Sequence, residues 1–222
     1  MKLRWHGQSA YTLEGDGRTV VVDPFDVTAL SGRVRFEYPP IESRPADLLL
    51  ITHEHGDHNW DAAVTGDPVV IRSTAGRIDS PIGEVVAVAS EHDDAAGTMR
   101  GPNTIFVFSL DGVRICHMGD FGQARLRSEQ VAAIGPIDLL IVPVGAGPTL
   151  DAAGAAEAVE MLAPGWVVPM HYRTPAIGFL EPADDFLGRF ADVHTLDAPE
   201  VEIAAPDRPE RPLVLHLAAP QR

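Results

Sequence analysis

The sequence predicts an α/β protein of the α+β type, in which layered β-sheets carry helices on their outer faces. Short apolar runs of strand length recur along the chain, and three further segments have the length and capping residues of helices. The 222 residues are 45% hydrophobic and 22% charged, an ordinary globular composition, and no repeat or linker divides them. We therefore expect a single domain spanning residues 1–222.

Each expected strand is an apolar run that is too short for a helix and is bounded by turn residues. The Asp111-Gly112 pair, which lies between two of these runs, is a strong signal for a hairpin turn. The expected strands are Val20–Val22, Leu48–Ile51, Val69–Ile71, Val85–Val88, Ile105–Phe108, Val113–Cys116, Leu139–Val142, Trp166–Val168 and Leu213–Leu217.

Helices are expected at Ser128–Ile134 and Asp151–Leu162, because each segment opens with a residue that can cap a helix N-terminus. Asp184–Phe190 is a third and shorter candidate. The segment 204–212 is rich in proline and precedes the last expected strand, so we expect a loop there.

Charge balance and cysteine content exclude several classes of protein. Asp and Glu outnumber Lys and Arg by 32 to 17, which gives a formal charge of −15 and a surface that repels nucleic acids and anionic membranes. The single Cys116 excludes an internal disulfide and a Cys-rich zinc site. The chain has no apolar stretch of signal-peptide or membrane-spanning length. We therefore expect a cytoplasmic protein with neither nucleic-acid nor membrane partners.

Four potential metal ligands lie within six residues, directly after the second expected strand. Alternate side chains of an extended segment point the same way, so His53 and His55 can bind one ion together. The turn at Gly56 then lets Asp57 and His58 reach a second ion. Imidazole nitrogens and carboxylate oxygens suit zinc, and also iron or manganese. The alternative interpretation is a solvated loop that happens to be rich in histidine.

One loop cannot complete two metal spheres, so other strand ends must contribute ligands. His92, Asp120 and His171 each lie just past an expected strand, and folding can gather all three at one edge of the sheets. For His92 the alternative is an ordinary surface histidine. His117 falls inside a strand three residues before Asp120, and we interpret it as a packed or supporting residue.

Other catalytic patterns fail. The zincin pattern H-E-x-x-H is broken by Asp57, and the turn at residues 7–11 has Tyr11 where a nucleophile elbow needs its second glycine. The segment 145–148 lacks the rest of a dinucleotide fingerprint, so it either borders the site or is a plain structural loop. Cys116 lies in the middle of a strand and is interpreted as a small buried hydrophobe. Three histidines have no partner pattern and are interpreted as structural: His6, His194 and His216.

These motifs together resemble the metallo-β-lactamase superfamily, and within it the small ascorbate-phosphate-lactonase-like metal-dependent hydrolases. The resemblance covers almost the whole chain and implies a four-layer αββα sandwich with metals held between the two sheets at one edge. It rests on the loop His53-Glu54-His55-Gly56-Asp57-His58, on Gly119-Asp120 and Pro169-Met170-His171-Tyr172, and on Trp5-His6-Gly7-Gln8-Ser9 and Val22-Asp23-Pro24.

The resemblance also implies a cofactor of two divalent metal ions, with zinc preferred and manganese or iron as alternatives. Carried over by position, the first ion is bound by His53, His55 and His92, the second by Asp57, His58 and His171, and both by Asp120.

At three further positions near the site, the resemblance either implies a supporting role or is broken by a different residue. Asp23 is expected to orient a ligand imidazole through a hydrogen bond, although an Asp before proline at a strand end is equally a turn residue. Gln8 stands where relatives often have His, and Phe121 follows Asp120 where Thr is common. Because of these two departures, the ascorbate-phosphate substrate is not carried over to this chain.

The predicted function is hydrolysis of an ester, lactone, amide or phosphoester bond in a small molecule. A hydroxide bridged between two ions roughly 3.5–4 Å apart attacks the carbonyl carbon or phosphorus, because metal binding lowers the pKa of water toward about 7. Asp57 is the expected catalytic residue, which orients the nucleophile or passes a proton to the leaving group. Tyr172 and Arg173 are candidate substrate contacts. The sequence carries no signal for an oligomeric state.

Two other functions remain open. An iron-dependent oxidoreductase or dioxygenase shares this fold, but a flavodiiron-like site resembles H-x-E-x-D-H, whereas this chain has His55 at the middle position and no flavin domain. Iron-loaded dioxygenase relatives with H-x-H-x-D-H do exist. A non-catalytic metal-binding protein is the other alternative, and the complete ligand set for both ions argues against it.

Overall fold

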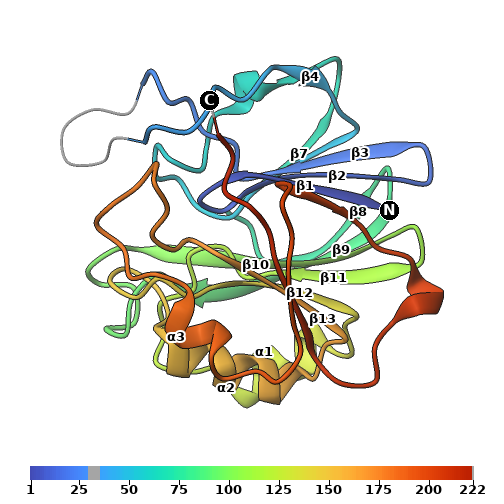
Figure 1. Ribbon diagram of the computed structural model, residues 1–222. Helices are drawn as coiled ribbons and strands as arrows, with labels where there is room; N and C mark the ends of the chain where they lie inside the picture. The colour runs from blue at the N-terminus through green and yellow to red at the C-terminus, as the bar shows by residue number, and fades with distance from the viewer. Residues whose placement is uncertain (30–35, 222) are drawn as a thin grey trace.

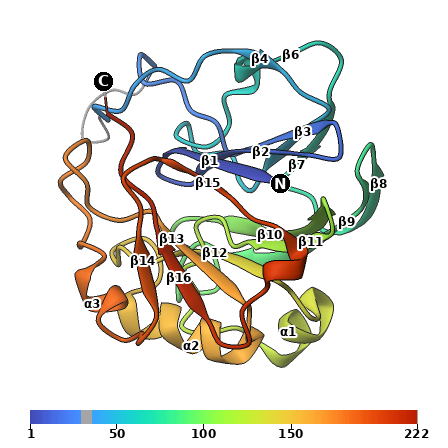
Figure 2. The ribbon, with the colours of Figure 1, turned by 45° about the vertical axis from the view of Figure 1, so that its right-hand side comes forward.

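The computed structural model describes residues 1–29 and 36–221, and two stacked β-sheets form its centre (Figure 1). Figure 2 shows the edge of the smaller sheet, where its short outermost strand pairs with the N-terminal strand. The smaller sheet runs in the order β15 (Glu200–Glu202), β1 (Lys2–Gly7), β2 (Ala10–Gly15), β3 (Arg18–Val22), β5 (Leu48–Ile51) and β7 (Val69–Arg72).

The larger sheet is built from the middle and the C-terminal part of the chain. The hairpin predicted at Asp111-Gly112 joins two of its strands, and both turn residues have positive φ, 53° and 74°. Its order is β14 (Val193–Thr195), β16 (Leu213–His216), β13 (Trp166–Met170), β12 (Leu139–Pro143), β11 (Val113–His117), β10 (Pro102–Leu110), β9 (Gly83–Glu91) and β8 (Gly76–Ser80).

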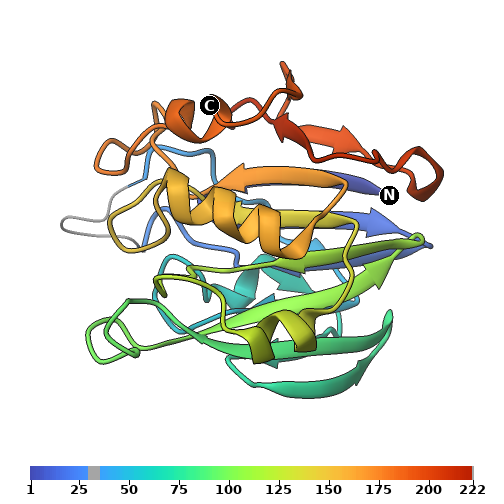
Figure 3. The same cartoon turned by 90° about the horizontal axis from the view of Figure 1, so that it is seen from below.

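Three α-helices accompany the larger sheet, and α1 and α2 lie across its outer face in Figure 3. Helix α1 (Ser128–Ile134) has the predicted bounds, and α2 (Ala152–Leu162) begins after Asp151, whose carboxylate accepts a hydrogen bond from the Gly154 N–H. Helix α3 (Asp184–Leu187) ends earlier than predicted, since Gly188 follows and favours termination.

The predicted α/β sandwich is confirmed, but the expected fourth, helical layer is absent from the described residues. Over the smaller sheet lie instead the short pair β4 (Arg44–Pro45) and β6 (Val64–Thr65), with a 3-10 turn at Asp61–Ala63. Ala46 and Val64 pack there against the sheet residues Val21, Leu49 and Ile51. The chain between β5 and β7 is taken up by the His-rich loop and this short turn, which leaves no length for a helix.

Strand direction decides where the candidate ligands gather. β3, β5 and β7 are mutually parallel, as are β11, β12, β13 and β16, and β9 runs in the same direction as β11 because β10 is antiparallel to both. The loops that follow β5, β9, β11 and β13 therefore emerge at a common edge, on the left of Figure 1. Each candidate ligand lies on one of these loops.

The sheets pack through a shared apolar core. In β1, Leu3 and Trp5 are buried in that core, whereas Arg4 and His6 alternate with them and belong to the opposite face of the sheet. Phe106 and its neighbours on β10 contribute to the same core from the larger sheet. Within the described residues, no helix has both the length and the apolar character needed to cross a membrane.

Candidate metal centre

Three histidines converge on one carboxylate oxygen at the common edge. The Nε2 atoms of His58, His92 and His171 each lie 3.3 Å from Oδ2 of Asp120, and all four side chains are buried. This separation is longer than a well-formed N–H···O hydrogen bond. It matches the spacing of about 3.3–3.4 Å between two atoms that bind one tetrahedral zinc ion at about 2.0–2.1 Å. The donor set therefore fits metal ions better than it fits direct contact.

A first group of potential ligands lies on the β9 side of the site. His53, His55 and His92 each offer a ring nitrogen, and the three nitrogens lie within 4.8 Å of one another. Nε2 of His53 lies 3.0 Å from Nδ1 of His55, which is a hydrogen-bond distance and places the two ring nitrogens face to face. His53 and His92 are buried and His55 is exposed, so this group is open to solvent on one side.

A second group consists of His58, Asp120 and His171, all buried, whose ligand atoms also lie within 4.8 Å of one another. Nε2 of His58 and Nδ1 of His171 have no hydrogen-bond partner among the described residues. A carboxylate oxygen of Asp57 approaches Nε2 of His58 to 3.8 Å, and the Asp57 side chain is 20% exposed. The structure thus brings together all seven predicted ligand candidates.

Neighbouring groups hold two of the imidazoles in the orientation that metal binding needs. Nδ1–H of His58 donates to Oδ2 of Asp23 over 3.0 Å, and Nδ1–H of His92 donates to the Pro148 carbonyl over 3.1 Å. With Nδ1 protonated in each case, Nε2 keeps its lone pair for an ion. Asp23 is itself fixed by the Thr52 backbone N–H and hydroxyl, at 2.8 and 2.6 Å. Asp23 thus makes the expected hydrogen bond to the imidazole of a candidate ligand.

Asp120 is positioned by hydrogen bonds with two distant residues and by the tight turn that precedes it. Its Oδ1 accepts a hydrogen bond from the Ser9 hydroxyl over 3.0 Å, and its backbone N–H donates to Oδ1 of Asn103 over 3.0 Å. The preceding Gly119 has φ +57°, and a Cβ there would collide with Asn103 and Thr52. The tight turn at Gly119 therefore places the Asp120 carboxylate between the two groups of histidines.

Burial and neighbouring charges shift the pKa values of the clustered side chains in different directions. Burial lowers the pKa of His53 and His92 below the ordinary value, and neighbouring imidazoles lower it further. For Asp120, burial raises the pKa, but His171 and His58 outweigh it and hold the carboxyl well below its usual range. Burial likewise lowers the pKa of His58, and Asp120 and Asp57 reverse that effect. Neutral His53 and His92 beside an ionised Asp120 are the protonation states that metal binding requires.

Three side chains near the site are engaged in packing or in hydrogen bonds with other parts of the chain. Nε2 of His117 lies 3.0 Å from the Ser9 carbonyl and its Nδ1 accepts from the Gly119 N–H, so His117 is packed as predicted. Tyr172 is buried in the core, with its ring centroid 5.3 Å from that of Trp5. The Arg173 Nε–H donates to the Leu180 carbonyl over 2.6 Å, which ties this side chain to its own loop.

Sequence reasoning missed the supporting residues Ser9 and Thr52 and the carbonyl of Pro148. Thr52 directly precedes His53, and a hydroxyl at the end of the strand before a ligand loop was an available signal. The segment 145–148 proves to border the site: its Pro148 carbonyl holds His92, and a Cβ on Gly145 would collide with the backbone of His171. Nothing in the local sequence indicated the Pro148 contact, because it depends on tertiary packing.

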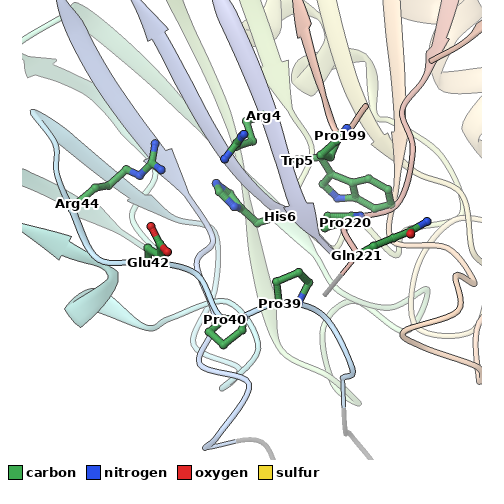
Figure 4. Close-up of a pocket in the computed structure, with 10 residues that line it drawn as sticks. All are labelled: Arg4, Trp5, His6, Pro39, Pro40, Glu42, Arg44, Pro199, Pro220 and Gln221. Atoms are coloured by element: carbon green, nitrogen blue, oxygen red, sulfur yellow. The ribbon is translucent and has the colours of Figure 1, made fainter. Parts of the chain in front are cut away.

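Two cavities differ in their relation to this centre. One, of about 520 Å³, is lined by Asp93, next to His92, and by Met99, Arg100 and Pro148, so it adjoins the metal ligands. The other, of about 340 Å³, lies beside β1 and includes Arg4, His6 and Arg44 (Figure 4). Its guanidinium groups pair with Glu200 at 2.7 Å and with Glu14 at 3.4 Å, and none of the seven candidate ligands lines it.

Comparison with known proteins settles the family. A family model described as a beta-lactamase superfamily domain matches residues 2–171. The chain belongs to the metallo-β-lactamase superfamily. It is 36% identical over 200 residues to the UPF0173 metal-dependent hydrolase of Thermococcus onnurineus, and 32% identical over 205 residues to that of Thermococcus kodakarensis. Both alignments cover 78% of this chain and 85% of the relative.

Solved structures of the superfamily agree in fold. A Thermotoga maritima protein assigned as a Zn-dependent hydrolase of the metallo-β-lactamase superfamily has a TM-score of 0.77 and 30% identity, covering 98% of this chain and 99% of that one. The diiron β-hydroxylase CmlA of Streptomyces venezuelae has a TM-score of 0.53 and 19% identity over 77% of this chain and 44% of its own, which shows the shared fold alone. With the His/Asp clusters, superfamily membership supports a metal-dependent hydrolase that uses divalent metal.

Proposed function

We propose that this metallo-β-lactamase-fold protein is a binuclear metal-dependent hydrolase acting on a small molecule. The observation that carries the proposal is the convergence of His58, His92 and His171 on one oxygen of Asp120 at 3.3 Å. A carboxylate shared between two groups of histidines is the arrangement that a bridging ligand requires. In the proposed site, one ion is held by His53, His55 and His92, the other by Asp57, His58 and His171, and Asp120 bridges them.

The ligand chemistry favours zinc. Five imidazole nitrogens and two carboxylates, with no thiolate among them, are ligands that zinc accepts readily, and manganese and iron accept the same atoms with lower preference for nitrogen. Spacings near 3.3 Å around Asp120 suit the short bonds and small coordination number of zinc. Zinc in two equivalents is therefore the proposed cofactor, with manganese or iron as alternatives.

Ions bound by these residues would supply a hydroxide nucleophile near neutral pH and Lewis-acid polarisation of the scissile bond. The chain's own part in the chemistry falls to Asp57, whose carboxylate is partly exposed and lies 3.8 Å from Nε2 of His58. From this position it can orient the attacking oxygen or carry a proton to the leaving group. His58 is unsuited to proton transfer, because its Nδ1 is bonded to Asp23 and its Nε2 would serve as the metal ligand.

The proposed substrates are small molecules with an ester, lactone, amide or phosphoester bond. The cavity of about 520 Å³ beside His92 has the volume of a small-molecule site, and it opens next to the first group of ligands. Its lining holds three carboxylates, Asp93, Asp94 and Asp151, against the single cation Arg100. Among these classes a neutral lactone or ester is favoured over a phosphoester, which makes the protein lactonase-like in the sense of the family resemblance.

The test uses zinc-loaded protein and panels of lactones, esters, amides and phosphoesters. Asp57→Asn is expected to lower kcat by two to four orders of magnitude, the usual contribution of a positioned acid or base. Asp67→Asn, at an exposed carboxylate that belongs neither to the candidate ligands nor to the lining of this cavity, is the matched control and is expected to retain activity. Full turnover by Asp57→Asn on every substrate that the wild type cleaves would refute the proposed role.

A further inference from the structure

The side-chain amide of Gln8 is buried without a hydrogen-bond partner among the described residues. The Gln8 side chain has no solvent exposure, and neither Nε2 nor Oε1 has a hydrogen-bond partner among the described residues. Other buried amides are satisfied: Asn103 donates to Ser90 and Met118 and accepts from Asp120, and Gln130 bonds to backbone and side-chain groups through both of its polar atoms. An apolar side chain of the same length would avoid the cost of burying an unpaired amide.

The backbone conformation at Gln8 is a second reason to look for a role of its side chain. Gln8 lies in the turn between β1 and β2 with φ +48°, a left-handed conformation that glycine or asparagine adopts at lower cost. The turn is fixed in place, because the Gln8 carbonyl accepts from the Trp5 indole N–H at 2.9 Å and from the His171 backbone N–H at 3.3 Å. A strained residue that keeps a long polar side chain points to a function for that side chain.

Two neighbours of Gln8 connect it to the candidate metal centre. Its carbonyl contacts the backbone of His171, and the adjacent Ser9 hydroxyl donates to Asp120. Seven buried side-chain polar atoms in the described residues lack a partner, and four of them belong to Gln8, His58 and His171. His58 and His171 are joined through Oδ2 of Asp120, and Gln8 adjoins this second group of ligands through the contact of its carbonyl with the His171 backbone.

We propose that the Gln8 carboxamide is a further functional residue of this site, which hydrogen-bonds through Nε2–H and Oε1 to the oxygen ligand held on the His58–Asp120–His171 side. That ligand is water in the resting protein and a substrate oxygen during turnover. A water molecule both accepts and donates, which satisfies the two unpaired ends of the amide together. This inference rests on the proposed function, because it requires ions at the site.

Gln8→Met tests the proposal, since methionine keeps the length of the side chain and removes both hydrogen-bonding groups. In the metal-free protein the variant is expected to unfold at the same temperature as the wild type or higher, because an unpaired amide has been removed. Zinc affinity is expected to fall 10- to 100-fold, as for other residues that support a metal ligand. The rise in unfolding temperature on zinc addition is therefore smaller than in the wild type.

The pH dependence provides a second readout. An N–H donated to the deprotonated form of bound solvent lowers the pKa of that solvent. Gln8→Met is therefore expected to move the corresponding inflection, in the spectrum of the cobalt-substituted protein and in kcat/KM, upward by roughly one to two pH units. Gln130→Met is the matched control, because it removes a fully paired buried amide and should destabilise the metal-free and zinc-loaded forms alike.

The outcomes separate this proposal from the function on which it rests. Wild-type protein that binds no metal would overturn both. Wild-type protein that binds zinc, together with a Gln8→Met variant of unchanged zinc affinity and unchanged pH inflection, would overturn the role of Gln8 and leave the hydrolase standing. Equal destabilisation of metal-free and loaded Gln8→Met would also overturn it, since the amide would then serve only to hold an ordinary buried water.

Discussion

At the residue scale, the Asp23 carboxylate determines which ring nitrogen of the candidate ligand His58 carries the proton. Asp23 has φ +46° and no solvent exposure, and its oxygens accept from Thr52 and from Nδ1–H of His58. An imidazole has one proton to place when neutral, so occupying Nδ1 with that proton leaves Nε2 free to bind an ion. The strained backbone and the buried carboxylate of Asp23 therefore lie where they determine the tautomer of His58.

Asp23→Asn is expected to weaken metal binding while the protein keeps its fold. The variant amide presents a donor toward Nδ1 of His58, which favours the tautomer with the proton on Nε2 and so removes that ligand atom. Isothermal titration with zinc should therefore show loss, or at least a 10- to 100-fold weakening, of one of the two binding events. Asp47→Asn, a change at a carboxylate remote from the site, is the control. Two unaltered binding events in Asp23→Asn would contradict the orienting role.

His6 permits a prediction about acid stability. Burial, together with the smaller effects of the Arg44 and Arg4 charges, lowers its pKa from 6.5 to about 4. Because the folded pKa lies below the unfolded value, the unfolded chain takes up the proton first. Stability from this group is complete above pH 6.5 and is lost as the pH falls toward 4, with a slope of at most about 1.4 kcal/mol per pH unit.

The measurement is urea unfolding of the metal-free protein at a series of pH values, for the wild type and for His6→Gln. Glutamine keeps a polar partner for the Thr12 hydroxyl, which lies 2.8 Å from Nε2 of His6, but it does not titrate. The difference in unfolding free energy between the two proteins should change between pH 6.5 and 4 and be constant above that range. A difference that is constant throughout would show that His6 titrates normally.

At the scale of elements, the loop after β9 is held in shape by one side chain. Asp93 accepts four backbone hydrogen bonds, from Ala95 and Gly97 on one oxygen and from Met99 and Arg100 on the other, at 2.7–3.0 Å. Burial raises the pKa of Asp93, but these donors outweigh it and hold the pKa below its ordinary value. One carboxylate therefore shapes the loop that follows His92 and lines the neighbouring cavity.

Replacing Asp93 is expected to expose this loop to proteolysis. Trypsin cleaves after arginine, and cleavage after Arg100 should accelerate in Asp93→Ala and, by a smaller factor, in Asp93→Asn, which keeps one of the two acceptor oxygens. Mass spectrometry of the fragments provides the rates, with cleavage after the exposed Arg125 as an internal control. Equal acceleration at both arginines would indicate general destabilisation and would contradict the local role of Asp93.

Which elements could be predicted depends on how their side chains are distributed. All nine strands expected from continuous apolar runs exist, because such runs are conspicuous in a sequence, and most of them are buried on both faces, β7 with its exposed Val69 and Val70 being an exception. β1 and β2 were missed: Leu3 and Trp5 of β1 alternate with Arg4 and His6, so the period-2 pattern was present but not a continuous run. The edge strands β14 and β15 carry too few apolar residues to be recognised without their partners.

At the scale of the whole molecule, the site is a consequence of strand direction. β5, β9, β11 and β13 end at one edge, so ligands spaced from residue 53 to residue 171 meet there. Sequence spacing predicted which residues gather, because each follows an apolar run. It could not predict the contacts of Ser9, Pro148 or Gln8, since these come from loops whose positions are fixed only by the packing of the two sheets. That residues 1–222 form one domain stays a prediction.

The central claim is that Asp120 bridges two metal ions between the two groups of histidines. The most direct test is the metal content per chain, by plasma mass spectrometry on untagged protein purified without chelator, for the wild type and for Asp120→Ala. We expect close to two equivalents of zinc or manganese in the wild type and a sharp loss in the variant. Two equivalents of iron would redirect the assignment toward oxygen chemistry. Substoichiometric metal that soaking does not restore, or metal content unaffected by Asp120→Ala, would contradict the site as described.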